Sequence, residues 1–437
     1  MSLTYHQMPP DLFSAVAAGG GGPAAIEILK QAQHSKHALL VLGVMAAAEK
    51  SEHAQRALAR RGYDLLRAIQ RRDPATVSSV IRHPSAGAWA HRTLVALRGG
   101  AGMPGAIPGG LAALAAAAAI RANLPAEIEV PVCDGMVMLP SLGAVGPVEA
   151  EVATLRNTGC RTDLIAAGRR ITIPVSYRER TPGWHPLCLV RAGSLKLLVD
   201  DVDPFRMPAA PNLATAIDPD SWSGVISEAW TLLELHHPAV AREVAEIVTV
   251  IVPLMRPPHG QVSSSSPETF GAIALSRPPD ACTLASTLAH EVQHIKLSAL
   301  LDLIPLALPD DGRRFYAPWR EDPRPVSGLL QGAYAYVGVS GFWRRQRELR
   351  PELDAHVEFA RWREAAALVT GVLRSSGQLT AKGREFVQVM EGTLQAWQAE
   401  PVPEMARRRA IQESEQHMAR WQERYGPIPA YPAMAEP

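Results

Sequence analysis

Aromatic residues and cysteines are scarce in this sequence. Phe, Trp and Tyr together make up 5% of the 437 residues. The four cysteines, Cys133, Cys160, Cys188 and Cys282, are far apart and form no CxxC pair. They also lack the CxxxCxxC spacing that binds the iron–sulfur cluster of radical enzymes. We therefore expect reduced structural thiols, and neither a disulfide framework nor a cluster.

An excess of charge and a long hydrophobic run are missing as well. The chain has 44 Lys and Arg against 43 Asp and Glu, a net charge of +1, so its charge balance does not suggest nucleic acid or an anionic membrane as a partner. The bland stretch 111–120 is too short and too alanine-rich to span a bilayer. Residues 1–6 lack the basic start and the apolar run of a signal peptide. We expect a cytoplasmic protein with no membrane and no nucleic-acid partner.

The hydrophobic residues, 47% of the chain, are enough for a large core. Apolar residues have helical spacing over about 10–100, and short alternating or β-branched runs follow over about 126–206. Helical spacing returns over 221–254, and further helices are expected up to about residue 425. The predicted fold class is α+β and predominantly helical. Its predicted parts are a helical N-terminal region (1–125), a small and mostly antiparallel β-rich region (126–220), and a helical metal-binding catalytic region (221–437).

The chemistry of the sequence is concentrated in His290-Glu291-Val292-Gln293-His294, an HExxH motif. The motif lies in a run with helical apolar spacing, and Asp280, after two prolines, is a candidate N-cap for that helix. Residues four apart lie on one helical face, so His290 and His294 can bind the same metal ion. Glu291 leans toward the same side. The sequence therefore predicts a metal site on a helix, preceded by a strand at 271–275.

Two histidines leave a metal incompletely coordinated, and the third ligand separates the hypotheses. The extended motif HExxHxxGxxH is excluded, because Leu297 and Leu300 occupy its last two positions. In another class of zinc protease a downstream glutamate completes the site, and the glutamate of the motif activates the bound water. The downstream helix offers Gln331 here, with Glu352, His356 and Glu358 further on. A zinc metallopeptidase with Glu291 as general base is one hypothesis, and a metal-free peptide-binding scaffold is another.

A proline-rich loop, 316–325, leads into a helix that begins near residue 326. Its small residues Gly328, Gly332 and Ala335 are spaced by one and two helical turns. We expect this small-residue face to let the helix approach the metal-binding helix closely.

These stretches together resemble the HExxH-motif peptide-modification proteins, which are α-ketoglutarate-dependent peptide hydroxylases of modified-peptide biosynthesis. The resemblance covers most of the chain and is faint near the start. It rests on 271–275, 290–294, 299–303, Pro318-Trp319-Arg320, 322–325 and 328–332, with 18–23 at the N-terminus. Because the iron–sulfur cysteines of the forms fused to radical SAM maturases are missing, the chain resembles the stand-alone form.

The resemblance implies a dioxygenase that uses Fe(II) and α-ketoglutarate (2-oxoglutarate) to hydroxylate a side-chain β-carbon of a ribosomally synthesised precursor peptide. A radical SAM maturase of the same pathway is a further implied partner. Gln331 stands where the family often has histidine, and its carbonyl oxygen is the candidate third ligand beside His290 and His294. His356 is the alternative ligand.

The remaining site predictions concern the substrate and the cosubstrate. The planar guanidinium of Arg320 or Arg324 suits the distal carboxylate of α-ketoglutarate, although either side chain could instead pair with Asp322 or Glu321. In this scheme Glu291 orients a ligand or a water molecule. Candidates to line the substrate pocket are Tyr316 and Tyr334. The C-terminal part is expected to look like a distorted relative of the zinc metalloprotease core.

Overall fold

The computed structural model describes residues 5–208, 210, 212–215, 218, 220–258 and 260–428. The fold is mixed α+β, mainly helical, with small sheets in which antiparallel pairs predominate, which confirms the predicted fold class. The chain divides into two compact units: unit 1 consists of Met1–Lys30, Val225–Ile247 and Pro278–Pro437, and unit 2 consists of Gln31–Gly224 and Val248–Arg277. The units interleave along the chain, and the predicted division at residues 125 and 220 stays a prediction.

The helices of unit 2 precede its strands in the chain. They are most of α2 (Gly22–Lys50), α3 (Arg56–Arg72), α4 (Pro74–Ile81), α5 (Pro84–Leu97) and α6 (Gly110–Arg121). Helix α6 is alanine-rich and buried from Leu111 to Ala119. It crosses α3 very closely at Gly62, where an added Cβ would lie 2.4 Å from the backbone nitrogen of Ala112. Small residues on both helices therefore allow this crossing.

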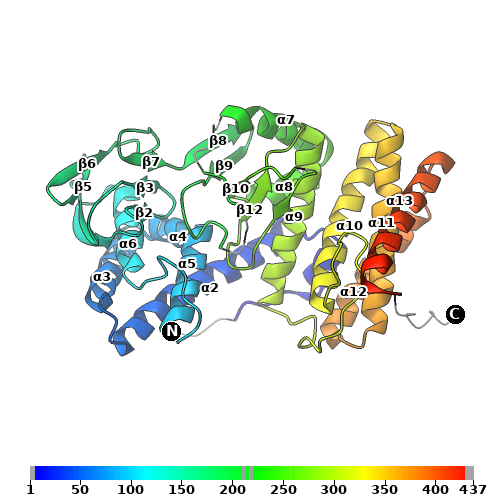
Figure 1. Cartoon of the computed structure of the whole chain (residues 1–437), viewed down its shortest axis with the longest axis horizontal. Coiled ribbons are helices and arrows are strands. Elements are labelled where there is room, and N and C mark those ends of the chain that lie inside the picture. Colours follow the sequence, from blue (N-terminus) through cyan, green and yellow to red (C-terminus); the bar gives the residue numbers. More distant parts are fainter. Residues whose placement is uncertain are drawn as a thin grey trace. The chain divides into compact units, whose positions relative to one another are not determined.

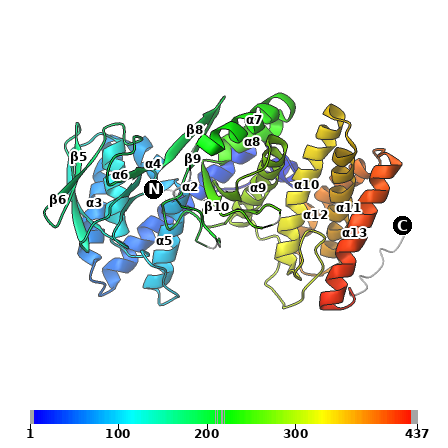
Figure 2. The same cartoon turned by 45° about the horizontal axis from the view of Figure 1, so that its top comes forward.

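Two antiparallel sheets lie beside these helices. The first has the order β1 (Ala126–Pro131), β4 (Val152–Asn157), β5 (Thr162–Ala166), β6 (Arg169–Ile173), and the second the order β2 (Val137–Leu139), β3 (Gly143–Val145), β7 (Trp184–Pro186). Helix α6 packs against α3, beside which it lies in Figures 1 and 2, and also against β1 and β4. Asn157 of β4 fixes this contact, since its Nδ2 donates to the carbonyls of Ala119 and Leu124 at 3.2 and 2.8 Å.

A third sheet contains parallel pairs. Its order is β11 (Ser263–Ser264), β12 (Ala272–Ser276), β10 (Val250–Leu254), β9 (Leu195–Val199), β8 (Cys188–Ala192). Strand β10 runs parallel to both β9 and β12, and all five residues of β10 are buried. The sequence predicted a strand at 271–275, which is confirmed, but it extended a helix to residue 254, which is wrong. The β-branched run Val250-Ile251-Val252 suits a strand buried on both faces.

Unit 1 is a group of packed helices. It contains α1 (Pro10–Ala17), most of α7 (Asp220–His236), α8 (Pro238–Ile247), α9 (Ala281–Leu301), α10 (Val326–Leu349), α11 (Leu353–Ser375), α12 (Ala381–Gln398) and α13 (Glu404–Tyr425). Helix α10 packs along α9 and α11, and α11 packs against α12 and α13 (Figure 1).

The close approach of α10 to α9 occurs at Gly338, where an added Cβ would lie 2.8 Å from the carbonyl oxygen of Ala289. The small residues predicted to make this approach have other neighbours. An added Cβ on Gly332 would collide with Trp319, and one on Gly328 would contact Arg324. The helix pairing was predictable from small residues, but the residue at the crossing was not.

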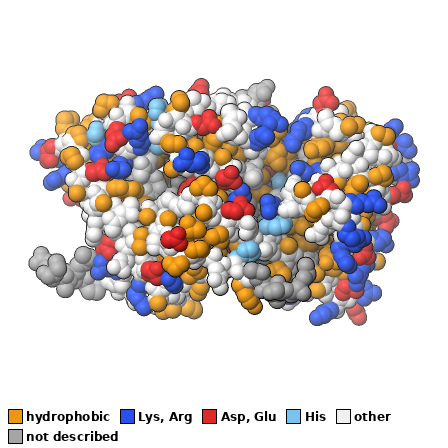
Figure 3. Space-filling view, turned by 180° about the vertical axis from the view of Figure 1, so that it is seen from behind, with side chains coloured by type: hydrophobic (Ala, Val, Ile, Leu, Met, Phe, Trp, Pro, Cys, Tyr) orange, Lys and Arg blue, Asp and Glu red, His pale blue; other side chains and the backbone are white. Residues whose placement is uncertain are grey.

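Two features concern the predicted absence of nucleic-acid and membrane partners: the distribution of charge on the surface, and the length and polarity of the helices. On the face shown in Figure 3, Lys and Arg side chains are mixed with Asp and Glu. Within the described ranges, no single helix is long and apolar enough to cross a membrane. The bent pair α1 and α2, at 101° to each other, passes the same test by length and composition only.

Candidate metal centre

Helix α9 carries the HExxH motif and begins as predicted. The carboxylate of Asp280 accepts the backbone N–H of Thr283 at 2.8 Å and the hydroxyl of Thr283 at 2.9 Å, so it caps the first turn. From this start the helical period places His290, His294 and Ser298 on one face. Gln293 and Lys296 lie on another face, where both donate to the carbonyl oxygen of Gly19.

The two histidine side chains converge. Their Nε2 atoms lie 3.1 Å apart, and the ring planes are inclined at 76°. Two nitrogens bound at about 2.1 Å to one metal, at a right angle, would be about 3.0 Å apart. The separation of His290 and His294 therefore fits two ligands of one metal ion.

Gln331 of α10 reaches the same pair from the other side of His294. Its Oε1 lies 3.0 Å from Nδ1 of His294, and its Nε2 donates to the hydroxyl of Ser298 at 3.2 Å. An amide oxygen only accepts, so Nδ1 of His294 carries the proton and its Nε2, the atom facing His290, has a free lone pair. Gln331 is placed to orient His294, while its predicted role as a direct ligand stays a prediction.

The protonation of His290 is governed by its surroundings. Burial lowers the pKa of His290 well below its usual 6.5, and the neighbouring His294 lowers this pKa further. A neutral imidazole is the form that binds metals. Burial therefore keeps His290 in the state that a metal site needs.

Glu291 is 1% exposed, and its charge acts on Tyr336 of α10. The pKa of Tyr336 is raised, first by burial and then by the negative charges of Glu358 and Glu291, whereas Arg361 and Arg320 act in the opposite direction. The Tyr336 ring in turn packs edge-on against His290, with centroids 5.2 Å apart. The charge of Glu291 therefore acts on the same ring that packs on His290, while its predicted role in the site stays a prediction.

A stack of three aromatic rings forms one wall of this site. Tyr336 stacks on Trp319 at 4.8 Å and on Trp362 at 4.3 Å between centroids. An added Cβ on Gly332 would lie 2.4 Å from Nε1 of Trp319, so only glycine leaves room for this indole. Glu358 accepts the indole N–H of Trp362 at 2.5 Å. The rings of the stack are partly exposed, which makes them a surface that a substrate could touch.

The sequence drew attention to neither Tyr336 nor Trp362. Tyr336 lies five residues after Gln331, on a helix already assigned to the site. Helical spacing could have suggested it, because Tyr336 also lies four residues after Gly332 and therefore on the same helical face as that glycine. Trp362 comes from α11, and no local signal connects that helix to the metal-binding helix.

The two arginines of the loop before α10 share one carboxylate. Nε of Arg320 and Nη1 of Arg324 donate to the two oxygens of Asp322 at 2.9 and 3.0 Å. Among the causes of the Tyr336 pKa shift, only Arg320 of these two arginines contributes. The charge of Arg320 therefore reaches the ring that packs on His290. The predicted binding of a cosubstrate carboxylate by Arg320 or Arg324 stays a prediction.

Both tyrosines proposed to line a pocket are buried. Tyr334 is fully buried, and its hydroxyl donates to the carbonyl of Val16 at 2.7 Å. Tyr316 is 3% exposed, and its hydroxyl lies 2.8 Å from Nδ1 of His417. The structure therefore places Tyr334 and Tyr316 in the core, whereas Trp319 and Tyr336 are partly exposed.

The other candidate ligand, His356, faces a different neighbour. Burial lowers its pKa first, and the charge of Arg347 lowers it further. Arg347 lies sixteen residues beyond Gln331 on α10, about 24 Å along the helix. Within the part of the chain that the structure describes, no three His, Cys, Asp or Glu side chains are grouped to hold a metal ion. Gln331 is the side chain from another helix that bonds to the histidine pair.

Comparisons with known proteins do not assign this chain to a family. Its sequence matches no model of a known protein family, and it matches no curated protein. The function proposed below therefore depends on the site geometry and on the resemblance carried by the motifs.

Proposed function

We propose that this protein is an Fe(II)- and α-ketoglutarate-dependent dioxygenase that hydroxylates a side-chain β-carbon of a ribosomally synthesised precursor peptide. The observation that carries the proposal is the His290–His294 pair, with two facing Nε2 atoms 3.1 Å apart. Two histidine ligands beside open coordination positions are a feature of non-haem Fe(II) oxygenases. The motifs around the pair add the resemblance to the peptide hydroxylases.

The residues of the site would have the following roles. His290 and His294 would hold Fe(II) through Nε2, Gln331 would fix the ring of His294, and Glu291 would orient a water molecule or a ligand from its buried position. Bound Fe(II), with dioxygen, would supply the oxidant: one oxygen atom enters the peptide, and α-ketoglutarate is oxidised to succinate and carbon dioxide. Arg320, once released from Asp322, would bind the distal carboxylate of the cosubstrate.

The aromatic stack supports a peptide as the substrate. Trp319, Tyr336 and Trp362 offer flat, partly exposed rings beside His290, and such rings hold carbon-rich side chains without requiring one sequence. We further propose that α9 and α10 form a distorted version of the zinc metalloprotease core. A radical SAM maturase would act on the same peptide in the pathway.

A second candidate is a zinc metallopeptidase. The observation that favours it is Glu291, a buried carboxylate one residue from His290 and thus in the position of the general base of HExxH hydrolases. In that case zinc would occupy the same histidine pair, and the peptide would be cleaved instead of oxidised.

The deciding experiment is anaerobic reconstitution of the full chain with Fe(II) and α-ketoglutarate, followed by a visible absorption spectrum. We expect a weak metal-to-ligand charge-transfer band that disappears in His290→Ala. His91→Ala, a histidine of α5 in unit 2, is the matched control and should retain the band. Tight zinc binding without such a band, together with peptide cleavage in place of a gain of one oxygen atom, would favour the peptidase.

A further inference from the structure

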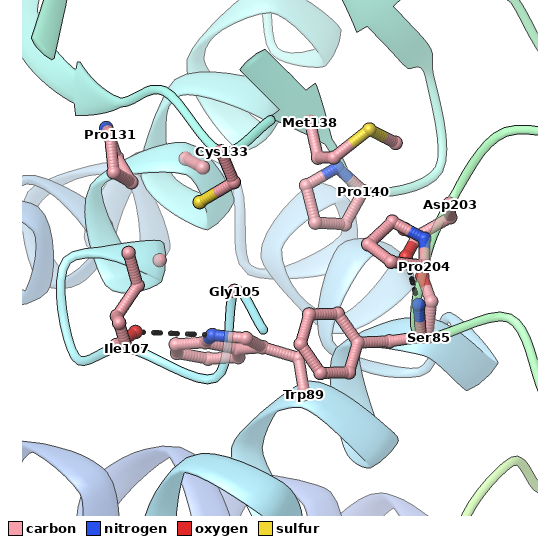
Figure 4. Close-up of a pocket in the computed structure, with 13 residues that line it drawn as sticks. Ser85, Trp89, Gly105, Ile107, Pro131, Cys133, Met138, Pro140, Asp203 and Pro204 are labelled. Atoms are coloured by element: carbon pink, nitrogen blue, oxygen red, sulfur yellow. Dashed lines mark hydrogen bonds between the residues drawn. The ribbon is translucent and has the colours of Figure 1, made fainter. Parts of the chain in front are cut away.

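Unit 2 contains a cavity with about 490 Å³ of empty space, part of it open to solvent. Its walls come from α5, α6, the loop between them, the segment around β2 and the segment 203–205 (Figure 4). The part of this space that a water-sized sphere can occupy is about 50 Å³, below the about 300–1,000 Å³ of pockets for drug-sized ligands, so the cavity suits a short alkyl group. None of its lining residues belongs to the metal centre.

The apolar wall of the cavity is held in place by backbone contacts. Nε1 of Trp89 donates to the carbonyl oxygen of Ile107 at 3.2 Å (Figure 4). An added Cβ on Gly110 would lie 2.4 Å from the same Nε1, so a glycine is required beside this indole. Met138 and Phe205 complete the wall. The cavity is therefore preformed and does not need a ligand to hold its wall in place.

The polar end of the cavity is acidic. Asp203, 4% exposed, lines the cavity, and its Oδ1 accepts the backbone N–H of Phe205 at 2.8 Å. Asp200, fully buried, accepts the backbone N–H groups of Val202 and Asp203 through Oδ1 at 3.1 and 2.9 Å. Its Oδ2 has no hydrogen-bond partner. Two carboxyl groups therefore share one buried region.

Arg206 lies near these carboxyl groups but does not form a hydrogen bond with them. Arg206 donates instead to the carbonyl oxygens of Asp203 and Ala214, at 2.7 and 3.4 Å, and acts on both carboxyl groups at longer range. Burial raises the pKa of both groups, that of Asp200 to about 7, where the charge of Asp203 contributes as the second cause. Among the residues that the structure describes, the acidic end therefore has no cationic side chain hydrogen-bonded to its carboxyl groups.

We propose that this cavity binds an alkylammonium group, with the carbon chain against Trp89, Met138 and Phe205 and the ammonium at Asp203. An ammonium would supply the missing charge and donate hydrogen bonds, and a short alkyl chain matches the apolar wall. A lysine side chain of a bound peptide and a free aliphatic amine share this chemistry. The inference does not depend on the function proposed for the metal centre.

The first test compares n-hexylammonium with the uncharged n-hexanol by isothermal titration calorimetry on the full chain. We expect the cation to bind about tenfold or more tightly than the alcohol, as for a hydrogen bond to a charged group. Asp203→Asn should abolish that preference, because the amide retains the acceptor for Phe205 but not the charge. Asp64→Asn removes the same charge at an exposed position of unit 2 and should keep the preference for the cation. Equal binding of the cation and the alcohol, or no binding of either, would overturn the proposal.

A second variant tests the location. Ala113 of α6 lines the cavity, so Ala113→Leu should fill the space without touching Asp203 and should remove binding of both probes. The helical circular dichroism of this variant, compared with wild type, reports whether it folds. Wild-type affinity for n-hexylammonium in the folded variant would place the cation elsewhere and overturn the assignment.

Two blocked tripeptides distinguish a peptide lysine from a free amine as the source of the ammonium. One contains lysine, and the other contains norleucine in its place. Binding of the lysine peptide alone, lost in Asp203→Asn, identifies a peptide side chain as the occupant. Binding of n-hexylammonium without either peptide identifies a free amine. Equal binding of the two peptides would show that the ammonium makes no contribution and would contradict the proposal.

Discussion

Oε1 of Gln331 lies 3.0 Å from Nδ1 of His294, on the side of the ring away from His290. One amide from α10 thereby decides which nitrogen of His294 is free to bind a metal. The carbonyl oxygen that the sequence offered as a third ligand is engaged as an acceptor. A second hydrogen bond, from its Nε2 to Ser298, holds the amide in this orientation.

Gln331→Ala should weaken metal binding by about 10- to 100-fold, the usual loss when a residue that orients a histidine ligand is removed. Gln331→Glu retains an acceptor for Nδ1 and should retain most of the affinity. Ser298→Ala loosens only the far end of the amide and should cost less than Gln331→Ala. Competition titration of Fe(II) or Zn(II) against a chelator measures all three, and full affinity in the alanine variant would contradict the orienting role.

Gly332→Ala should displace Trp319 and disrupt the aromatic stack beside His290. The added methyl group would lie 2.4 Å from the indole, so we expect a loss of stability of about 1–3 kcal/mol from overpacking and a changed tryptophan fluorescence spectrum. Gly371→Ala is the matched control, because an added Cβ there has no atom within 4 Å. It should stabilise α11 by about 0.5–1 kcal/mol. Equal effects of the two substitutions would argue against the close contact.

Asp200→Asn should raise the melting temperature more at pH 8 than at pH 4. The pKa of Asp200 rises from 3.8 in the unfolded chain to about 7 in the folded protein, because the group is buried. The folded state therefore holds a proton that the unfolded state releases, and wild-type stability falls by about 1.4 kcal/mol for each pH unit across this window. The asparagine variant lacks this pH-dependent loss of stability, because its side chain does not titrate. Melting curves of both proteins at pH 4, 6 and 8 measure the difference, and a constant difference at all three would refute the assignment.

Lys296→Met should destabilise unit 1 by about 3–5 kcal/mol, as expected when one partner of a buried ion pair is removed. Nζ of Lys296 donates to Glu243 at 2.6 Å and to the carbonyl oxygens of Gly19 and Gly20 at 3.2 and 2.8 Å. Lys382→Met, an exposed control whose partner Glu385 lies one turn away, should cost no more than about 1 kcal/mol. Urea unfolding followed by circular dichroism measures both, and equal midpoints would contradict a structural role for Lys296.

Sequence reasoning found the parts of the site that depend on local signals. The cap at Asp280, the helical period and the spacing of His290 and His294 lie within about fifteen residues, and all of them follow from short-range rules. The loop before α10 could be predicted from its prolines. These features place the histidine pair correctly without knowledge of the rest of the fold.

What the sequence missed depends on contacts between distant segments. Trp362 belongs to α11, and its position against Tyr336 is set by how two long helices pack. Strand β10 was taken for helix, because Val250-Ile251-Val252 is a short apolar run whose length and neighbours do not separate strand from helix. The roles of Tyr316 and Tyr334 depended on burial, and an aromatic residue next to a motif does not reveal whether it faces the core or a pocket.

The contact between Lys296 and the turn at Gly19 and Gly20 also orders events during synthesis. Lys296 follows Gly20 by 276 residues, which a ribosome adds in about 14–55 s at 5–20 residues per second. Until then the two carbonyl oxygens have only water as a partner, and the helix that holds the histidines has not been made. The segment of unit 2 that ends at Gly224 leaves the ribosome earlier and can begin to fold first. A chain arrested before residue 296 would therefore leave the turn at Gly19 and Gly20 without its Lys296 contact, available to chaperones and proteases.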